Sequence, residues 1–377
     1  MEGTPRLNRG ADPSIDRFLN RRRCARQLRN YVRMRLFSPY SDPCVDGSYR
    51  GGLVNLNAQA IYPDQVRLRR GDTARERRAK RALDRLILRD ARGRRLYVPF
   101  GCKGGRCPQF AADIGSPRWR AHLARRARRE LSHRYRGIFL DDVNWAVNVS
   151  DGREQLVRPR DPRTRRPMTD GTWKRAMAAL VRAVARQDPR REVMVNTVWW
   201  KPESTLDDPL VADTARRVTW WELERGFEDV RRGQSFDGLL ALIDRLHSLG
   251  VNVNLGNYFA TDRPAAEFEL AGHLLTGDGR DTLSTEYRVC PASDRRYRSC
   301  RGSFWAGYRV RLGAALGPRQ VRPDGLYERP FQRGMVLVNP PGAPARSGML
   351  DGLYRDLDGT PRVFAGLAGG QALVLTR

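Results

Sequence analysis

Short apolar stretches alternate with amphipathic helical patterns along most of this chain, and that alternation restricts the fold more than any other feature. It is typical of repeated βα units that build a parallel sheet. Eight of the stretches have the length and composition of β-strands, and eight is the number that closes a (β/α)8 barrel. The predicted strands are residues 33–40, 53–62, 95–101, 137–142, 193–200, 218–224, 251–258 and 281–288.

Two helices between these strands are predicted by the spacing of their apolar residues. One apolar stripe consists of Trp173, Met177, Leu180, Val181 and Val184. A second consists of Leu239, Ile243 and Leu246, and Gly250 follows at a position suited to end a helix. We interpret His247, near that end, as a packed or capping residue rather than a metal ligand.

The length of 377 residues suits one barrel with a small appendage. From about residue 325 the pattern changes to short β-like runs, separated by Pro-Pro-Gly, Asp-Gly and Gly-Gly turns. We therefore predict an α/β fold, a (β/α)8 TIM barrel with a small C-terminal antiparallel β appendage. Its parts are an N-terminal arm at 1–32, the barrel at 33–324, and a β region at 325–377 that packs on the barrel because no flexible linker precedes it.

The chain carries a formal net charge of +28, which arginine supplies almost alone because only four lysines occur. Clustered cations attract polyanions. Here the arginines are scattered over most of the predicted helices and loops, which disfavours a dedicated nucleic-acid binder. Two runs are dense, 67–85 and 118–136, and the second follows a helical pattern whose arginines would form a solvated face. For a carbohydrate partner, the arginine excess favours an anionic polysaccharide.

Six cysteines occur, and we predict that they pair in sequence order: Cys24 with Cys44, Cys102 with Cys107, and Cys290 with Cys300. Disulfides favour an oxidising, extracellular or cell-surface location, although the start MEGTPRLNRG shows no hydrophobic signal-peptide core. There is no CxxC pair and only four histidines occur, so no zinc site is expected. No apolar run approaches the roughly 20 residues of a membrane span, so a soluble body is expected.

Four carboxylates follow two of the predicted strands, at the barrel end where catalytic side chains lie. The fourth strand ends in Asp141 and Asp142, and the sixth ends in Glu222 and Glu224. Because side chains alternate, at most one of the two aspartates points straight into the mouth of the barrel, whereas the glutamates share a face. Glycoside hydrolysis needs such a pair, since one acid protonates the leaving oxygen while the other attacks the anomeric carbon or activates water. The sequence thus predicts hydrolysis of O-glycosidic bonds, with retention or inversion left open.

Amides, aromatic rings and an arginine beside these acids are candidates for binding a sugar, whose hydroxyl edges suit amides and whose CH faces suit rings. They are Asn144, Trp145, Asn196, Trp199, Trp200, Arg225, Asn257 and Tyr258. Each tryptophan could equally pack in a core, and a salt bridge to Arg225 could explain the carboxylates. A non-catalytic carbohydrate-binding barrel and a basic nucleic-acid binder are the alternative functions. The motifs GxxxxGKS, GxxxxGKT, GxGxxG, HExxH and GxSxG are absent, and no metal or organic cofactor is expected.

Six segments occur in an order and spacing that match a known family. They read SPY at 38–40, AIYP at 60–63, LYVPFGC at 96–102, ADIG at 112–115, YRGIFLDDVN at 135–144 and LERG at 223–226. Over roughly 38–283 the chain resembles hypothetical glycosyl hydrolase family 15, a group of bacterial glycoside hydrolases, and 327–340 resembles that group's closing β region. The resemblance implies a TIM barrel distantly similar to α-galactosidase and polygalactosaminidase-like enzymes.

The resemblance also implies roles for two of the four carboxylates. In these relatives a glycine, three further residues and then an acid end the fourth strand, and that acid acts as nucleophile or base. The pattern selects Asp141 over Asp142. The LERG match favours Glu224 over Glu222 as the proton donor.

Overall fold

The computed structural model describes residues 7–9, 35–38, 53–102, 106–133, 137–153, 155–256, 262–284 and 306–377. The chain divides into two compact units. One consists of Met1–Val54 with Thr219–Arg377, and the other of Asn55–Val218. We call them the outer unit and the middle unit, after their positions in the sequence, and describe each by itself.

Eight parallel strands form one hydrogen-bonded sheet that closes into a barrel, and helices follow most of them along the chain. In barrel order the strands are β1 (Leu7–Arg9), β10 (Thr282–Ser284), β9 (Asn252–Leu255), β8 (Trp220–Leu223), β7 (Glu192–Asn196), β6 (Gly137–Asp141), β3 (Leu53–Asn57) and β2 (Arg35–Ser38). A separate antiparallel sheet follows near the C-terminus. The predicted fold class is therefore confirmed.

One predicted barrel strand is wrong, and one barrel strand was not predicted. Residues 95–101 form only isolated bridges, such as Tyr97 with Phe110, outside the barrel. They belong to the segment between β3 and α5 (residues 58–116), which we call the excursion. Leu96 and Val98 are 1% and 0% exposed there, whereas Phe100 is 50% exposed, so the burial of two alternate residues produced the sequence pattern of a strand. The missing strand is β1, whose three residues are too few to show a pattern. The two errors cancel in the count, so β6 and β8 are still the fourth and sixth barrel strands.

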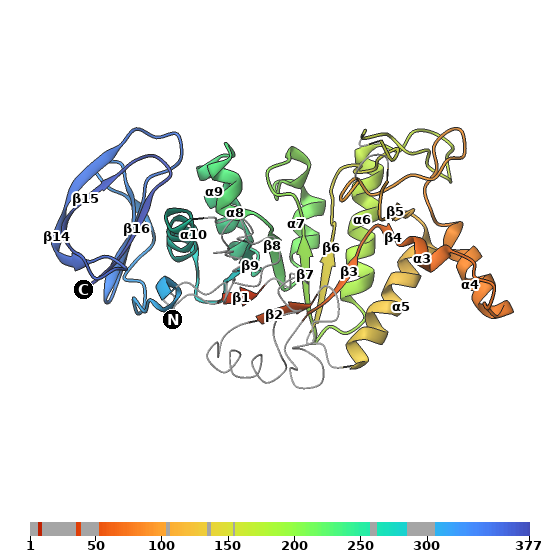
Figure 1. The fold of residues 1–377 in the computed structure, drawn as a ribbon, viewed down its shortest axis with the longest axis horizontal. Helices are drawn as coiled ribbons and strands as arrows, with labels where there is room; N and C mark the ends of the chain where they lie inside the picture. The colour runs from red at the N-terminus through yellow and green to blue at the C-terminus, as the bar shows by residue number, and fades with distance from the viewer. Residues whose placement is uncertain are drawn as a thin grey trace. The chain divides into compact units, whose positions relative to one another are not determined.

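The middle unit carries three helices after its strands, α5 (Pro117–His133), α6 (Asp170–Ala185) and α7 (Pro209–Ala215), with a short 3-10 turn η1 (Pro202–Ser204) (Figure 1). The excursion after β3 contains β4 (Ala60–Ile61), α3 (Pro63–Val66), α4 (Ala74–Asp84) and β5 (Phe110–Ala111). Helix α6 buries the predicted stripe of Trp173, Met177, Leu180, Val181 and Val184, which confirms that prediction. Thr169 caps this helix by accepting from the amide of Thr172.

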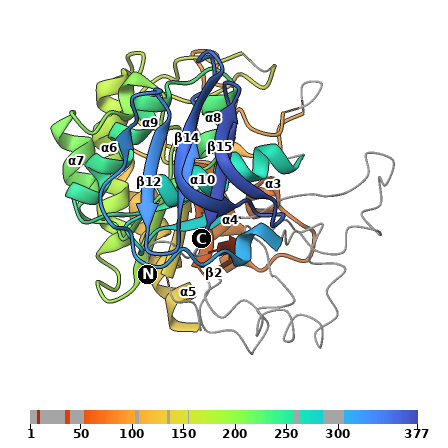
Figure 2. The ribbon, with the colours of Figure 1, turned by 90° about the vertical axis from the view of Figure 1, so that its left-hand side faces the viewer.

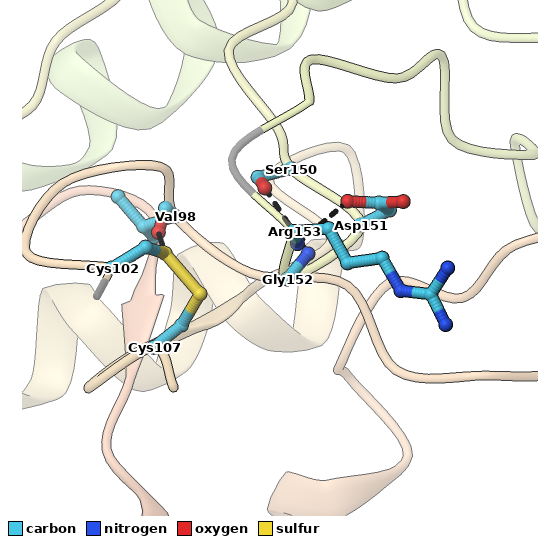
Figure 3. The surroundings of a disulfide bond; sticks show 7 residues. All are labelled: Val98, Cys102, Cys107, Ser150, Asp151, Gly152 and Arg153. Carbon is cyan, nitrogen blue, oxygen red and sulfur yellow. Dashed lines mark hydrogen bonds between the residues drawn. A yellow bond between two sulfur atoms is a disulfide. The ribbon is translucent and has the colours of Figure 1, made fainter. Parts of the chain in front are cut away.

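A disulfide joins Cys102 and Cys107 within the excursion, with Cα atoms 4.1 Å apart (Figure 3). The Sγ atom of Cys102 lies 3.6 Å from the carbonyl oxygen of Val98. The same stretch pairs with the loop after β6, because Tyr97 and Ser150 exchange backbone hydrogen bonds of 2.8 and 2.9 Å. The disulfide therefore closes a loop that is tied to the chain segment following β6. The other four cysteines lie outside the described residues.

The outer unit contains helices α8 (Gly226–Arg231), α9 (Phe236–Ser248), α10 (Arg263–Thr276) and the 3-10 turn η2 (Ala306–Arg309). Helix α9 buries Leu239, Ile243 and Leu246 as predicted, and Gly250 follows it with a φ of 77°. Six strands then form the antiparallel sheet in the order β11 (Gln320–Val321), β12 (Tyr327–Phe331), β13 (Gly334–Val338), β16 (Ala372–Thr376), β14 (Arg346–Arg355) and β15 (Pro361–Leu367). Leu337, Tyr354 and Leu375 lie in its apolar core.

Helix α10 connects the antiparallel sheet to the barrel strands of the outer unit (Figures 1 and 2). It contacts β13 and β16 as well as α8, α9 and β10, so every residue from Ala265 to Thr276 is buried. The backbone N–H of Val374 donates to Oε1 of Glu267 at 3.0 Å. Arg329 donates to the carbonyl oxygens of Leu274 and Gly277, at 3.0 and 2.6 Å, and so caps the end of the helix. Among the described helices, none combines the length and hydrophobicity that crossing a membrane requires.

Helix α10 also buries a carboxyl group that should make stability depend on pH. Glu269 is 1% exposed, and burial, with the nearby Glu228 carboxylate, raises its pKa well above the ordinary value. When folding raises the pKa of a carboxyl group, the group does not reduce stability at pH values below its ordinary pKa. Stability is lost as the pH rises from the ordinary pKa toward the pKa in the folded protein. We therefore expect Glu269→Gln to raise the melting temperature at pH 8 by roughly 2–4 °C, the response to about 1 kcal/mol. At pH 3.5 the same variant should have the melting temperature of the wild type. Thermal melts that show no rise in melting temperature at pH 8 would contradict this account.

Candidate active site

Asp141, the last residue of β6, is held by amides from both neighbouring strands. In the register of β6 and β7, Leu140 lies opposite Val195, so Asp141 lies beside Asn196. The Nδ2 atom of Asn196 donates to Oδ1 of Asp141 at 3.0 Å, and the backbone N–H of Asp142 donates to the same oxygen at 2.9 Å. From β3, Nδ2 of Asn55 approaches Oδ2 at 3.5 Å. All three groups are donors, so the carboxylate serves as an acceptor, as a nucleophile or general base must.

Asp142 has an unusual backbone conformation, with a φ of 57°. A residue other than glycine at positive φ is strained by about 1–2 kcal/mol, and such strain is concentrated at functional sites. The side chain accepts a hydrogen bond from Nδ2 of Asn57 in β3. The side chains of the two aspartates thus contact different amides, that of Asn196 for Asp141 and that of Asn57 for Asp142.

The loop after β6 is fixed from two directions. The backbone N–H of Val143 donates to the carbonyl oxygen of Asn196 at 2.9 Å. The Nε1 atom of Trp173, in α6, donates to the carbonyl oxygen of Asn144 at 2.9 Å. Asn144 and Trp145 are 6% and 1% exposed, so this loop packs into the unit rather than over it. The segment that presents Asp141 is therefore rigidly supported.

The two candidate tryptophans after β7 differ in exposure. Trp199 is 8% exposed and belongs to the packed interior. Trp200 is 39% exposed, and Nζ of Lys201 lies 5.9 Å from the centre of its ring. An aromatic ring that is open on part of its surface can stack on the CH face of a sugar. Of these two, Trp200 has the surface for that role.

Sequence reasoning missed three amides that follow one another at every second position, Asn55, Asn57 and Gln59. They alternate with apolar residues at the end of β3 and in the turn after it, and alternate residues of a strand share a face. Gln59 is 0% exposed, and its side-chain amide makes no hydrogen bond within the described part of the chain. The turn lies beside β6, because the N–H of Ala58 donates to the carbonyl oxygen of Asp141 at 2.9 Å. The signal available in the sequence was an amide repeat inside an apolar stretch.

In the outer unit, Glu222 and Glu224 lie in different environments. Glu222, in β8, is 2% exposed and accepts a hydrogen bond from Nδ2 of Asn254 in β9. Asn254 in turn accepts from Oγ1 of Thr282 in β10 at 2.7 Å, so a polar ladder crosses three adjacent strands. Glu224 follows the last residue of β8 and is exposed in a turn. Glu224 is therefore the glutamate with access to solvent.

The backbone of Glu224 is held against the end of β9. The N–H of Gly256 donates to the carbonyl oxygen of Leu223 at 2.8 Å. A Cβ atom on Gly256 would lie only 1.8 Å from the carbonyl oxygen of Glu224, so only glycine fits there. Arg225 is the N-cap of α8, and its Nε atom pairs with Oδ1 of Asp229 at 3.0 Å. The remaining candidates, Asn257 and Tyr258, lie outside the described residues.

One group of metal-ligand type occurs among the described residues, His247, Asp278 and Asp281, whose ligand atoms lie within 4.8 Å of one another. Nε2 of His247 lies 2.8 Å from Oδ2 of Asp281, and Oδ1 of Asp281 accepts from the N–H of Val253 at 2.7 Å. Asp278 pairs with Arg280 at 2.6 Å. These contacts lie near the N-terminal ends of β9 and β10, the barrel end that serves stability rather than catalysis. We therefore interpret the group as a structural hydrogen-bond network.

No family model and no curated protein matches this sequence. Among solved structures, the chain is similar to the glycoside hydrolase domain of PelA from Pseudomonas aeruginosa, with 17% identity and a TM-score of 0.37 over 75% of this chain and 95% of that one. It is similar to Amy13B from Eubacterium rectale, with 8% identity and a TM-score of 0.45 over 100% and 96% of the two chains. It is also similar to the xylanase TsXylA from Thermoanaerobacterium saccharolyticum, with 13% identity and a TM-score of 0.36 over 75% and 85%. At these values the likeness carries no information on catalytic residues or substrate.

Proposed function

We propose that this chain is a glycoside hydrolase that cleaves O-glycosidic bonds of a poly- or oligosaccharide, as its resemblance to hypothetical glycosyl hydrolase family 15 implies. The observation that carries the proposal is the setting of Asp141. This acid ends a barrel strand, is half-buried, and accepts hydrogen bonds from a neighbouring strand and from the backbone of Asp142. Fixed donors around one carboxylate hold it in one orientation, with its oxygens set as hydrogen-bond acceptors. That orientation suits a nucleophile or general base.

In this proposal Asp141 acts on the anomeric carbon and Glu224 acts on the leaving oxygen. Asp141 either forms a bond to the anomeric carbon or removes a proton from the water that attacks it. Glu224, exposed after β8, gives its proton to the glycosidic oxygen as the bond to the anomeric carbon breaks. The mechanism requires both carboxyls to flank one glycosidic bond, about 5 Å apart for retention and roughly 6.5–9.5 Å apart for inversion. The disulfide Cys102–Cys107 supports an oxidising, extracellular setting for this activity.

Trp200 is proposed as the stacking platform for a sugar ring. We expect Trp200→Ala to raise KM about fivefold with kcat nearly unchanged, because stacking worth about 1 kcal/mol would be lost in ground state and transition state alike. Leu156→Ala is the matched control, since Leu156 is another exposed apolar residue of the middle unit, at 61% exposure. Steady-state kinetics on a cleaved glycan measure both values. An unchanged KM for Trp200→Ala would remove the residue from the binding surface.

The test of the proposed function is release of reducing ends from a panel of neutral and anionic glycans. Cleavage of at least one glycan, lost in Asp141→Asn, is the expected result. Binding of a glycan without any release would support the alternative, a non-catalytic carbohydrate-binding barrel, for which the exposed ring of Trp200 is the favourable observation. Neither binding nor release on the whole panel would contradict both functions.

A further inference from the structure

Helix α4 divides into two faces of different charge. At about 100° per residue, Glu76, Lys80, Leu83 and Asp84 lie on one half of the helix surface, and Arg75, Arg78, Arg81 and Arg85 lie on the other. Lys80, Leu83 and Asp84 are half-buried, so the first half is the one that turns toward the protein. All four arginines are exposed. We call these four residues the arginine face.

The carboxylates near the arginine face form hydrogen bonds or ion pairs with other groups. Asp72 accepts from Nζ of Lys80 at 2.7 Å, and this contact lowers the pKa of Asp72. Glu76 forms a capping box with Thr73, the N-cap of α4. Asp84 pairs with Arg95 at 2.5 Å and with Arg89 at 3.3 Å. Within the described ranges, no carboxylate forms an ion pair with the arginine face.

The arginine face differs from an ordinary solvated helix surface. Such surfaces usually alternate the sign of charge at i,i+4 spacing, because opposite charges there stabilise a helix and like charges weaken it. Here Arg78 and Arg81 are three residues apart, and Arg81 and Arg85 are four apart, and the arginine face contains no acid. The residues between them are Ala79, Lys80, Ala82, Leu83 and Asp84, of which Lys80, Leu83 and Asp84 lie on the opposite half of the helix. No residue of α4 is buried, so burial does not compensate for the repulsion. A bound polyanion would relieve it.

We propose that the arginine face is a docking site for an anionic polysaccharide, such as a chain of uronic acids. The four guanidinium groups extend over about 15 Å of helix, which suits a polymer with repeated charges better than a small anion. The choice of a polysaccharide over a nucleic acid rests on the proposed function. Helix α4 belongs to the excursion that leaves β3 beside Asp141, where the N–H of Ala58 donates to the carbonyl oxygen of that acid at 2.9 Å. The excursion that binds the polysaccharide would thus begin next to Asp141, the proposed nucleophile.

The test compares two variants from which the same charge has been removed. R75Q/R78Q/R81Q removes three charges of the arginine face, and R125Q/R128Q/R129Q removes three from the exposed side of α5, a helix that packs against β6 and α6. The probe is polygalacturonate, titrated into the full chain at 50 and 200 mM NaCl. We expect the α4 variant to bind at least about tenfold more weakly at 50 mM and with a shallower salt dependence, because fewer counterions are displaced. The α5 variant should lose about twofold or less.

Thermal melts should show that both variants fold, with the α4 variant close to the wild type in stability. It loses repulsive charge pairs, which offsets the loss of the favourable charge of Arg81 in the last turn of the helix. Equal losses of affinity in the two variants would overturn the proposal, since net charge alone would then explain binding. Duplex DNA that binds tighter than polygalacturonate at equal charge concentration, with the same dependence on α4, would also overturn it and assign the face to nucleic acid.

The proposal of a docking site and the proposal of a hydrolase can be rejected independently. Asp141→Asn should bind polygalacturonate as the wild type does, because Asp141 is not part of the arginine face. Binding that depends on α4 in a chain that cleaves no glycan would uphold the docking site and reject the hydrolase. Glycan cleavage by the wild type, together with equal polygalacturonate affinity in the wild type and the α4 variant, would uphold the hydrolase and reject the docking site.

Discussion

Replacing Asp141 by Asn is expected to lower kcat at least about a thousandfold on any glycan that the wild type cleaves. An amide can neither attack the anomeric carbon nor remove a proton from water. The fold should tolerate the change, because the carboxamide oxygen can still accept from Nδ2 of Asn196, which now donates at 3.0 Å. Steady-state kinetics measure the loss, and circular dichroism with thermal melts shows that the variant is folded.

The neighbouring acid provides the control for this prediction. Asp142→Asn should lower kcat less than about tenfold, because in the proposed mechanism Asp141 alone acts on the anomeric carbon, and an Asn at 142 keeps an oxygen that can accept from Asn57. Glu224→Gln should also lower kcat, most strongly on substrates whose leaving group needs a proton and least on aryl glycosides with acidic phenols. Full activity in Asp141→Asn, or a larger loss in Asp142→Asn, would reverse the assignment of the two aspartates.

Gly256→Ala is expected to destabilise the protein by about 3 kcal/mol or more, a fall in melting temperature of roughly 6–12 °C. The new Cβ atom would lie 1.8 Å from the carbonyl oxygen and 2.4 Å from the carbonyl carbon of Glu224. Both are backbone atoms, so a side-chain rotation cannot relieve the contact. The chain at Glu224 must move, and the proposed proton donor moves with it.

Gly317→Ala is the matched control for this substitution, because a Cβ at Gly317 meets nothing within 4 Å and the residue belongs to the same unit. Its stability should stay within about 0.5 kcal/mol of the wild type. The kcat of Gly256→Ala, measured at a temperature where this variant is still folded, should fall further on substrates with poor leaving groups than on those with good ones, as for Glu224→Gln. If Gly256→Ala were as stable and active as the wild type, the end of β9 would not fix Glu224.

The fold could be predicted from the sequence wherever a segment had enough residues to show a period. Helices α6 and α9 repeat apolar residues over three or more turns, and both were predicted with their buried side chains. Strand β1 has three residues and no pattern, because its pairing with β2 and β10 is set by the backbone and by distant segments. In residues 95–101, Leu96 and Val98 are buried by the excursion around them, and burial alone does not distinguish a barrel strand from an irregular segment.

The carboxylates of the candidate site could be found because an acid directly after an apolar strand is conspicuous. Their surroundings could not be, because they come from other strands. The sequence has no local sign that Asn55 and Asn196 would reach Asp141, since 86 and 55 residues separate them. Glu222 and Glu224 were expected on one face, but β8 ends at Leu223, so one is enclosed by the sheet and the other is exposed in a turn. Exposure is a property of the closed sheet rather than of sequence spacing.

The most direct test of the central claim is a crystal structure of Asp141→Asn bound to an oligosaccharide that the wild type cleaves. We predict that one glycosidic bond lies between the side chain at position 141 and the carboxyl of Glu224, with the two groups roughly 5–9.5 Å apart across it. A sugar bound elsewhere, or a bond that only one of these two side chains approaches, would contradict the proposal that acids at the ends of β6 and β8 together cleave it.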